Sequence, residues 1–446
     1  MFDRITNGIE ANLPRFYRLW KEGGWILLGQ VATLLGGLAL VKVLTEYLEP
    51  SEYGEVALGL TLANLVNLVI MGTLSSGVSR FFSIASEKND LGGYLKSSLK
   101  LLCLAVIATV SIGLSIGVAL FFSGGVQWLW MVLVIVLYSL FAGYNGALSS
   151  MQNAARQRSI VALHNGMDAW LKIGFAVLFI VSFGSSSIMV IVGYLCSSAL
   201  ISASQTYHVK KLLTARKVEL ASSSAGEWMS TMWLYSWPFM IWGVFGWAQQ
   251  SSTRWALEAF VSTEDVGRYA VVAQIGYLPI QTGIGLLMTF IMPILYARAG
   301  DASDTLRREG VDIMIHKIAL TGVFLTLIAS LTTAIFHEFI FQVLVAEEYR
   351  SISKYMPIMV LAGGVFGIAL VISSRFFAFL APSKLIPAST GSSVIGIVAA
   401  FVCTYYFSIL GAVFAMLIHS ISFLVLTMIT GIRMKKNMRL SVDAFV

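Results

Sequence analysis

Residues 49–70 read EPSEYGEVALGLTLANLVNLVI, an acidic turn with Pro, Tyr and Gly that leads into a long apolar run. Residues 261–282, VSTEDVGRYAVVAQIGYLPIQT, repeat this plan of an acidic turn, a Gly, a Tyr and an apolar run. The two stretches lie about half a chain apart, as in membrane proteins built from two repeats. The sequence therefore predicts two related halves, each beginning with a helix, this turn and a second helix.

The composition is that of a membrane protein. Of the 446 residues, 57% are hydrophobic and only 12% are charged, whereas soluble proteins are about 25% charged. Apolar runs of the roughly 20 residues that a spanning helix needs recur along the whole chain. We expect an all-α polytopic membrane protein with about twelve transmembrane helices. The expected spans are residues 24–44, 55–80, 99–122, 127–148, 160–182, 187–208, 229–251, 267–295, 313–336, 356–380, 385–407 and 410–432.

Twelve spans divide into two lobes of six. Because six is an even number, both repeats insert the same way round and are related by an axis along the membrane normal. The expected domains are an amphipathic N-terminal segment at 1–23, an N-lobe at 24–209, an inter-lobe linker at 210–228, a C-lobe at 229–432 and a basic tail at 433–446.

Lys and Arg concentrate on one side of this topology. The loops around residues 80–100, 156–158 and 210–217 are basic, as is the C-terminal tail, whereas the opposite loops hold acidic residues such as Glu46 and Glu264. Short cytoplasmic loops carry an excess of Lys and Arg, so both termini are expected to be cytoplasmic. The basic residues behind the net charge of +7 are then expected to set the membrane orientation and to contact lipid headgroups. No nucleic-acid partner is expected.

Three ionisable residues share one stripe of the fifth expected span. His164, Asp168 and Lys172 are spaced by four residues and lie on one helix face. Since a charge at the centre of a span costs about 2.5–3.5 kcal/mol, we expect the stripe to face inward, with Asp168 between Lys172 and His164. Lys172 lies deep in the span, and a basic group there predicts a water-filled cavity for anions. The alternative for His164 and Asp168 is a position at the helix end near the membrane surface.

Other polar residues within or beside the spans are further candidates for this cavity. The additional cations are Lys42, Arg375 and Arg254, for which snorkelling to headgroups or a structural ion pair is the alternative. The uncharged candidates are Asn64, Asn67, Gln249, Gln274 and Gln281, which would equally well hold neighbouring helices together. Pro238 lies in a Trp-rich span and removes one backbone hydrogen bond, so it is the expected hinge.

Several chemistries are not indicated. Cys103, Cys196 and Cys403 lie in apolar runs without metal-ligand spacing, so neither a metal site nor a disulfide is expected. The chain has no P-loop motif, and its short loops leave little room for a catalytic domain. We expect a transporter rather than an enzyme, with no cofactor; proton or sodium coupling is left open.

Two stretches resemble the polysaccharide and oligosaccharide (O-antigen-type) flippases of the multidrug/oligosaccharidyl-lipid/polysaccharide (MOP) exporter superfamily. Residues 40–82 are similar to the opening of these proteins, and residues 235–275 are similar to their Pro-containing seventh span and the turn that follows. The positions that carry the resemblance are Leu48, Pro50, Tyr53, Gly54, Gly77, Arg80, Phe81 and Phe82, then Pro238, Arg254, Gly267 and Tyr269.

The resemblance implies a V-shaped central cavity between two MATE-like lobes and alternating access without ATP. It implies that undecaprenyl-diphosphate-linked oligosaccharide units move from the cytoplasmic to the outer leaflet of the bacterial inner membrane, for O-antigen, capsule or exopolysaccharide synthesis. The cavity cations would be Lys172, Arg375, Lys42, Arg80 and Arg254, with Asp168 and His164 coupling or tuning the site. The expected partners are the lipid-linked substrate, membrane lipids and polysaccharide polymerase machinery.

Two other functions compete with this interpretation. A proton- or sodium-coupled drug or metabolite antiporter of the same superfamily would rely on acidic residues within the lobes. Asp168 is the only clear acid deep in an expected span, which favours the flippase. A membrane glycan polymerase or ligase would need a long external loop, and residues 337–355 are short and partly apolar.

Overall fold

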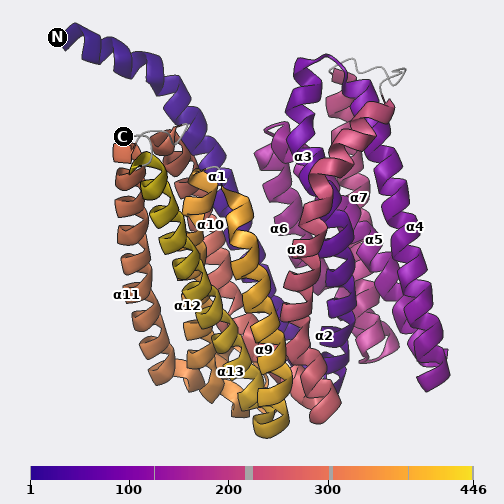
Figure 1. Ribbon diagram of the computed structural model, residues 1–446. Coiled ribbons are helices and arrows are strands. Elements are labelled where there is room, and N and C mark those ends of the chain that lie inside the picture. Colours follow the sequence, from indigo (N-terminus) through magenta and orange to yellow (C-terminus); the bar gives the residue numbers. More distant parts are fainter. Residues whose placement is uncertain (1, 125, 216–224, 301–304, 380, 444–446) are drawn as a thin grey trace. The chain divides into compact units, whose positions relative to one another are not determined.

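The computed structural model describes residues 2–124, 126–215, 225–300, 305–379 and 381–443, and every element in these ranges is helical (Figure 1). The elements are α1 (Phe2–Tyr47), α2 (Pro50–Leu65), η1 (Val66–Met71), α3 (Gly72–Glu87), α4 (Leu91–Gly124), α5 (Val126–Ala154), α6 (Arg158–Phe183), α7 (Ser187–Ala215), α8 (Ala225–Phe260), α9 (Thr263–Gly276), α10 (Leu278–Ala299), α11 (Thr305–Leu344), η2 (Glu347–Tyr355), α12 (Met356–Ala378), η3 (Pro382–Leu385) and α13 (Ile386–Asp443). The expected all-α membrane architecture is confirmed.

Ten helical segments of the described ranges are long and apolar enough to cross a membrane, two fewer than the sequence predicts. One difference is α8, in which Trp residues alternate with Ser, Gln and Gly and reduce the hydropathy. The other is α13, which counts as one segment although it holds two expected spans.

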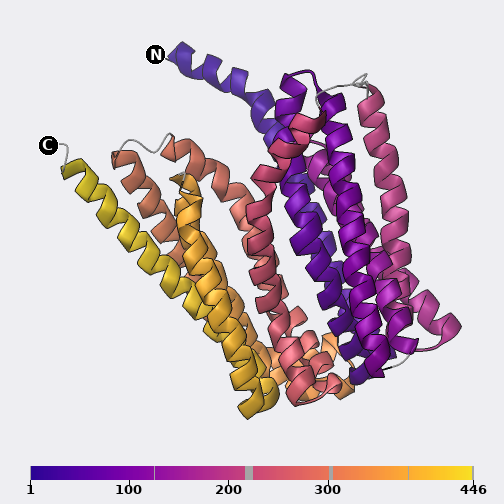
Figure 2. The same cartoon turned by 45° about the vertical axis from the view of Figure 1, so that its right-hand side comes forward.

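Helix α13 reverses direction at Ser408. Its backbone there has φ 51° and ψ −132°, which breaks the helix. Beyond the break the chain returns along itself, because Nδ1 of His419 lies 3.1 Å from the carbonyl oxygen of Ser392. Figure 2 shows the yellow C-terminal half of α13 running from the bottom of the view up to the C-terminus. The two arms correspond to the expected spans at 385–407 and 410–432.

The chain forms two compact units. Unit 1 comprises residues 1–40, 70–182 and 189–239, and unit 2 comprises 41–69, 183–188 and 240–446. Most of each expected lobe lies in one unit, but residues 41–69 pack with unit 2. The lobe boundaries at 24–209 and 229–432 stay a prediction.

Parts of the two terminal segments and of the linker lie outside the described residues. Residues 2–47 form one continuous helix, so the expected N-terminal segment continues directly into the first span. The side chains of residues 1–22, which carry its expected amphipathic face, are not among those described. The same holds for the side chains of the tail from 435 onward and for linker residues 216–224.

In unit 2 the two repeats contact each other through their glycines. Helix α2 packs against α9, and a methyl group added to Gly54 would meet the carbonyl oxygen of Thr263. Reciprocally, a methyl group on Gly267 would meet the carbonyl oxygen of Pro50. Thr263 follows Pro50 by the same number of residues as Gly267 follows Gly54, so the contact is pseudo-symmetric. Only a residue without a side chain permits this approach of two backbones.

In unit 1 small residues fix the position of α6. Gly29 and Gly36 of α1 lie against Ala162 and Ala169 of α6. On another side, Gly193 of α7 packs against the backbone of Ala176. Helices that approach this closely gain van der Waals contact and hold their polar side chains in a defined register. These contacts set the register of the stripe that includes Asp168.

Replacement of Gly54 tests the contact between the repeats. We expect Gly54→Ala to lower the free energy of unfolding, because forcing an atom into a packed interface costs about 1–3 kcal/mol. The measurement is the thermal midpoint of the purified protein in detergent. Gly285→Ala is the matched control, since a methyl group there meets no atom within 4 Å. An unchanged thermal midpoint for Gly54→Ala would show that α2 and α9 can move apart without a loss of stability.

Candidate functional site

The central feature of unit 1 is an ion pair inside α6. Nζ of Lys172 lies 2.6 Å from Oδ2 of Asp168, one helical turn earlier. The side chain of Lys172 is 19% exposed and that of Asp168 is 23% exposed, so the pair is neither fully buried nor at the surface. Lys172 lies about 21 Å along the helix from Arg158, at 1.5 Å per residue. Such a depth in a spanning helix is costly unless the charge is compensated, and Asp168 supplies the compensation.

Two tyrosine rings from neighbouring helices flank the ammonium group. Nζ of Lys172 lies 5.6 Å from the ring centroid of Tyr138 on α5 and 5.8 Å from that of Tyr194 on α7. The two ring centroids are 6.0 Å apart. A cation within about 6 Å of an aromatic face is attracted by the ring quadrupole. The site thus combines a positive charge with two aromatic faces.

Ser197 of α7 fixes the acid of the pair. Its hydroxyl lies 2.9 Å from Oδ1 of Asp168, to which it donates a hydrogen bond. The carboxylate therefore has one oxygen on Lys172 and the other on Ser197. This arrangement holds α6 and α7 together and keeps Asp168 in the rotamer that reaches Lys172.

His164 is engaged elsewhere. Its Nδ1 lies 2.7 Å from the carbonyl oxygen of Ile160, and its Nε2 lies 2.9 Å from Oγ of Ser204. The carbonyl can only accept, so Nδ1 carries a proton and Nε2 of the neutral ring accepts from the hydroxyl. The ring also contacts His208, with centroids 5.3 Å apart. His164 is buried and does not complete the stripe below Asp168 as expected; its tuning role stays a prediction.

A row of polar contacts continues the site between α5 and α7. The side chain of Asn145 donates to the carbonyl oxygen of Ser198 at 3.0 Å and accepts from the hydroxyl of Ser202 at 2.7 Å. The hydroxyls of Tyr144 and Thr206 lie 3.0 Å apart. Sequence reasoning missed these residues and the two flanking tyrosines. The spacing of Ser198, Ser202 and Thr206 by four along one face of α7 is a signal that would have found part of them.

The other cations lie in different surroundings. Lys42 pairs with Glu46 on a half-exposed face of α1, and Arg80 is exposed on α3. Arg375 of α12 is only 6% exposed, with its Nε 3.9 Å from Oδ1 of Asp312 on α11. The guanidinium of Arg254 lies 3.4 Å from the carbonyl oxygen of Ala57. Only Lys172 belongs to the cluster around Asp168, and a substrate role for the other four stays a prediction.

The expected polar residues mainly join neighbouring helices. Gln249 reaches the sulfur of Met416 at 3.6 Å, Gln274 accepts from the hydroxyl of Tyr53 at 3.4 Å, and Gln281 donates to the carbonyl oxygen of Gly363 at 3.0 Å. Asn64 is exposed, whereas Asn67 lies half-buried in the π-helical segment η1. Wider π-helical turns change the register that an α-helix would give these two residues.

The sequence and the fold were compared with known proteins. A family model described as "Polysaccharide biosynthesis protein" matches residues 19–297, more than half of the chain. The chain belongs to this family. The match covers α6 and therefore the Lys172 cluster. No curated protein matches the sequence.

Solved structures share the fold of this polysaccharide biosynthesis protein at low sequence identity. The lipid II flippase MurJ in an inward closed conformation has a TM-score of 0.70 at 13% identity, over 92% of this chain and 86% of that chain. An inward-facing multidrug resistance MATE transporter of the MOP superfamily has a TM-score of 0.62 at 14% identity, over 91% and 95%. The eukaryotic MATE transporter AtDTX14 has a TM-score of 0.61 at 12% identity, over 94% and 96%. The fold is that of MOP-superfamily transporters and flippases.

The ion pair of this family member is tested by a double-mutant cycle. We expect Asp168→Asn to lower the thermal midpoint more than the double variant Asp168→Asn/Lys172→Gln, because the single change leaves Lys172 without its counter-charge. A coupling energy of about 0.5–3 kcal/mol is typical of residues in contact. The matched control is Glu46→Gln, which breaks the more exposed pair with Lys42 and should shift stability by about 0.5 kcal/mol or less. Additive effects at Asp168 and Lys172 would mean that the pair does not stabilise the fold.

Proposed function

We propose that this protein is a flippase that moves a polyprenyl-diphosphate-linked oligosaccharide, such as an undecaprenyl-linked unit, from the cytoplasmic to the outer leaflet of the bacterial inner membrane. Membership of a polysaccharide biosynthesis family and the MOP fold support this class of function. The observation that carries the proposal is the Lys172 cluster, a basic group held in the middle of a spanning helix between two tyrosine rings.

A diphosphate needs such a group on its path. Moving an ionised oxygen into hydrocarbon without a partner is prohibitively costly. The ammonium group of Lys172 has three N–H donors, so it can donate to a phosphate oxygen while it keeps Asp168. Because Ser197 holds the other oxygen of Asp168, the acid stays in place when the phosphate competes for the lysine.

The surroundings of Lys172 suit a sugar. The rings of Tyr138 and Tyr194 are buried beside the ammonium group, and the half-buried side chains of Tyr144, Asn145 and Thr206 place polar groups further along the same two helices. Pockets that combine a few fixed polar groups with aromatic surfaces are typical of small-molecule sites. In this proposal the polar row receives the hydroxyl groups of the first sugars.

The competing antiporter function receives less support from this site. An acid that couples cation movement must exchange its proton or ion with water. Asp168 instead already has a lysine partner and a serine partner. We therefore propose that the substrate gradient and the downstream polymerase machinery that removes the product supply the direction of transport, with a proton or sodium ion as an auxiliary.

A leaflet assay tests the function. The purified protein is placed in liposomes with a fluorescent polyprenyl-diphosphate oligosaccharide, and an impermeant quencher reports the fraction of lipid that faces outward. We expect Lys172→Ala to reduce the rate of flipping at least about tenfold, equivalent to about 1.4 kcal/mol at the barrier. The matched control is Lys384→Ala, which removes one exposed charge and should flip normally.

Folding is checked by the thermal midpoint of each variant. If Lys172→Ala does not fold, the charge-neutral variant Asp168→Asn/Lys172→Gln replaces it. Normal flipping without Lys172 would contradict the assigned role of this residue. No flipping by the wild type, together with proton-driven efflux of small cations, would favour the antiporter.

A further inference from the structure

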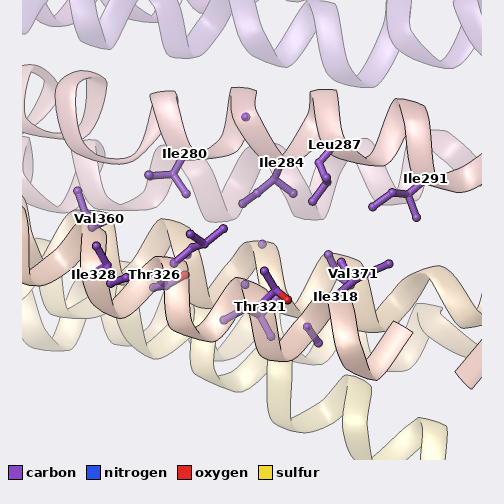
Figure 3. Close-up of a pocket in the computed structure, with 18 of the residues that line it drawn as sticks. Ile280, Ile284, Leu287, Ile291, Ile318, Thr321, Thr326, Ile328, Val360 and Val371 are labelled. Carbon is purple, nitrogen blue, oxygen red and sulfur yellow. The ribbon is translucent and has the colours of Figure 1, made fainter. Parts of the chain in front are cut away.

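An apolar groove of about 800 Å³ lies within unit 2, and none of its lining residues belongs to the Lys172 cluster. Helices α10 and α11 form its walls and α12 forms its floor (Figure 3). Figure 3 shows Ile280, Ile284, Leu287 and Ile291 in a row along α10. Of the ten residues labelled there, only Thr321 and Thr326 carry a polar side-chain atom.

Glycines explain why α10 and α11 both pack closely on α12 while free volume remains between α10 and α11. Gly367 of α12 receives the side chain of Ile284, and Gly364 receives that of Thr326. Each wall therefore packs directly on α12. At Gly283 of α10, by contrast, an added methyl group would meet no atom within 4 Å. The open volume thus lies in front of Gly283, between the two walls.

One end of the groove is basic. Lys317 lines it beside Ile318, at the end where Figure 3 places Ile291 and Val371. Its side chain is exposed. Arg298 lies in the last turn of α10, and Arg308 and Glu309 lie near the start of α11, so Lys317 is the cation that lines the groove itself. An apolar slot with a cation at one end complements a hydrocarbon chain with an anionic head.

We propose that this groove binds the polyprenyl chain of the lipid-linked substrate next to its diphosphate, with Lys317 as a phosphate contact at a different stage of transport from the contact with Lys172. The inference rests on the proposed function for the identity of the lipid. Along α10 the groove runs about 16 Å from Ile280 to Ile291, at 1.5 Å per residue, so it holds only the part of the chain that follows the diphosphate. A diphosphate head group carries more negative charge than the head group of an ordinary anionic phospholipid, so a cation at the end of the groove favours the polyprenyl lipid.

Photolabelling tests the occupant. The probe is a polyprenyl-diphosphate monosaccharide with a diazirine on the isoprene units nearest the diphosphate, and labelled peptides are mapped by mass spectrometry of the full-length protein in lipid nanodiscs. We expect labels on α10, α11 and α12. Gly283→Leu, which fills the groove, should reduce this labelling roughly tenfold, or about 1.4 kcal/mol of binding. Gly285→Leu is the matched control, because it is equally open but does not line the groove.

Lys317→Gln separates the head group from the chain. This exposed side chain can change without repacking the core, so the variant keeps the test decisive if Gly283→Leu does not fold. We expect a several-fold loss of labelling by the diphosphate probe and no loss with the corresponding polyprenyl alcohol. Lys384→Gln should change neither.

Two results would overturn the proposal. Equal labelling of the groove by a phosphatidylglycerol that carries the diazirine on an acyl chain would identify a slot for bulk lipid. If the protein flips the substrate in a Lys172-dependent manner but the groove is not labelled, the groove does not bind the polyprenyl chain. The proposed flippase function would then still stand. Conversely, selective polyprenyl labelling of the groove without any flipping would support this site while contradicting the proposed function.

Discussion

A polar group that enters hydrocarbon must find its partner inside the protein, and this constraint governs the structure at every level. For the backbone it is met here by helices, because their hydrogen bonds close within one segment. For side chains it requires pairs: Lys172 has Asp168, and the buried Arg375 has Asp312. Lys42 is half-exposed and its pair with Glu46 is correspondingly less enclosed. Burial within the protein, more than residue type, separates these cations.

The same constraint makes small residues important for the site. Polar partners on different helices meet only if the helices are held at the right distance. Gly29 and Gly36 allow α1 to approach α6, and Gly193 allows α7 to do so. The hydroxyl of Ser197 on α7 can then reach Asp168, and the ring of Tyr194 can reach Lys172. The charge is thus preorganised by packing that carries no polar chemistry itself.

The sequence predicted what depends on local spacing. Apolar runs gave the helices and their approximate ends, and the spacing of four residues gave the pair of Asp168 and Lys172. Contacts between distant segments were missed, because nothing local to α6 indicates that Tyr138 and Tyr194 will flank it. The partner of His164 was missed for a related reason, because Ser204, which bonds its ring, lies forty residues away in the sequence. The π-helical segment η1, which contains Asn67, was also missed, because a periodic pattern does not reveal where π-helical turns replace α-helical geometry.

Two of the unit boundaries that divide helices lie at interruptions of the helical hydrogen bonds. One boundary divides α8 between Phe239 and Met240, next to Pro238, which lacks a backbone donor. Another divides the π-helical segment η1 between Val69 and Ile70, and π-helical turns are frequently functional. A helix that passes from one compact unit into another bends most readily where its hydrogen bonds are already interrupted. If the proposed transport requires a change of conformation, this is a physical reason to expect Pro238 and η1 to accommodate the movement.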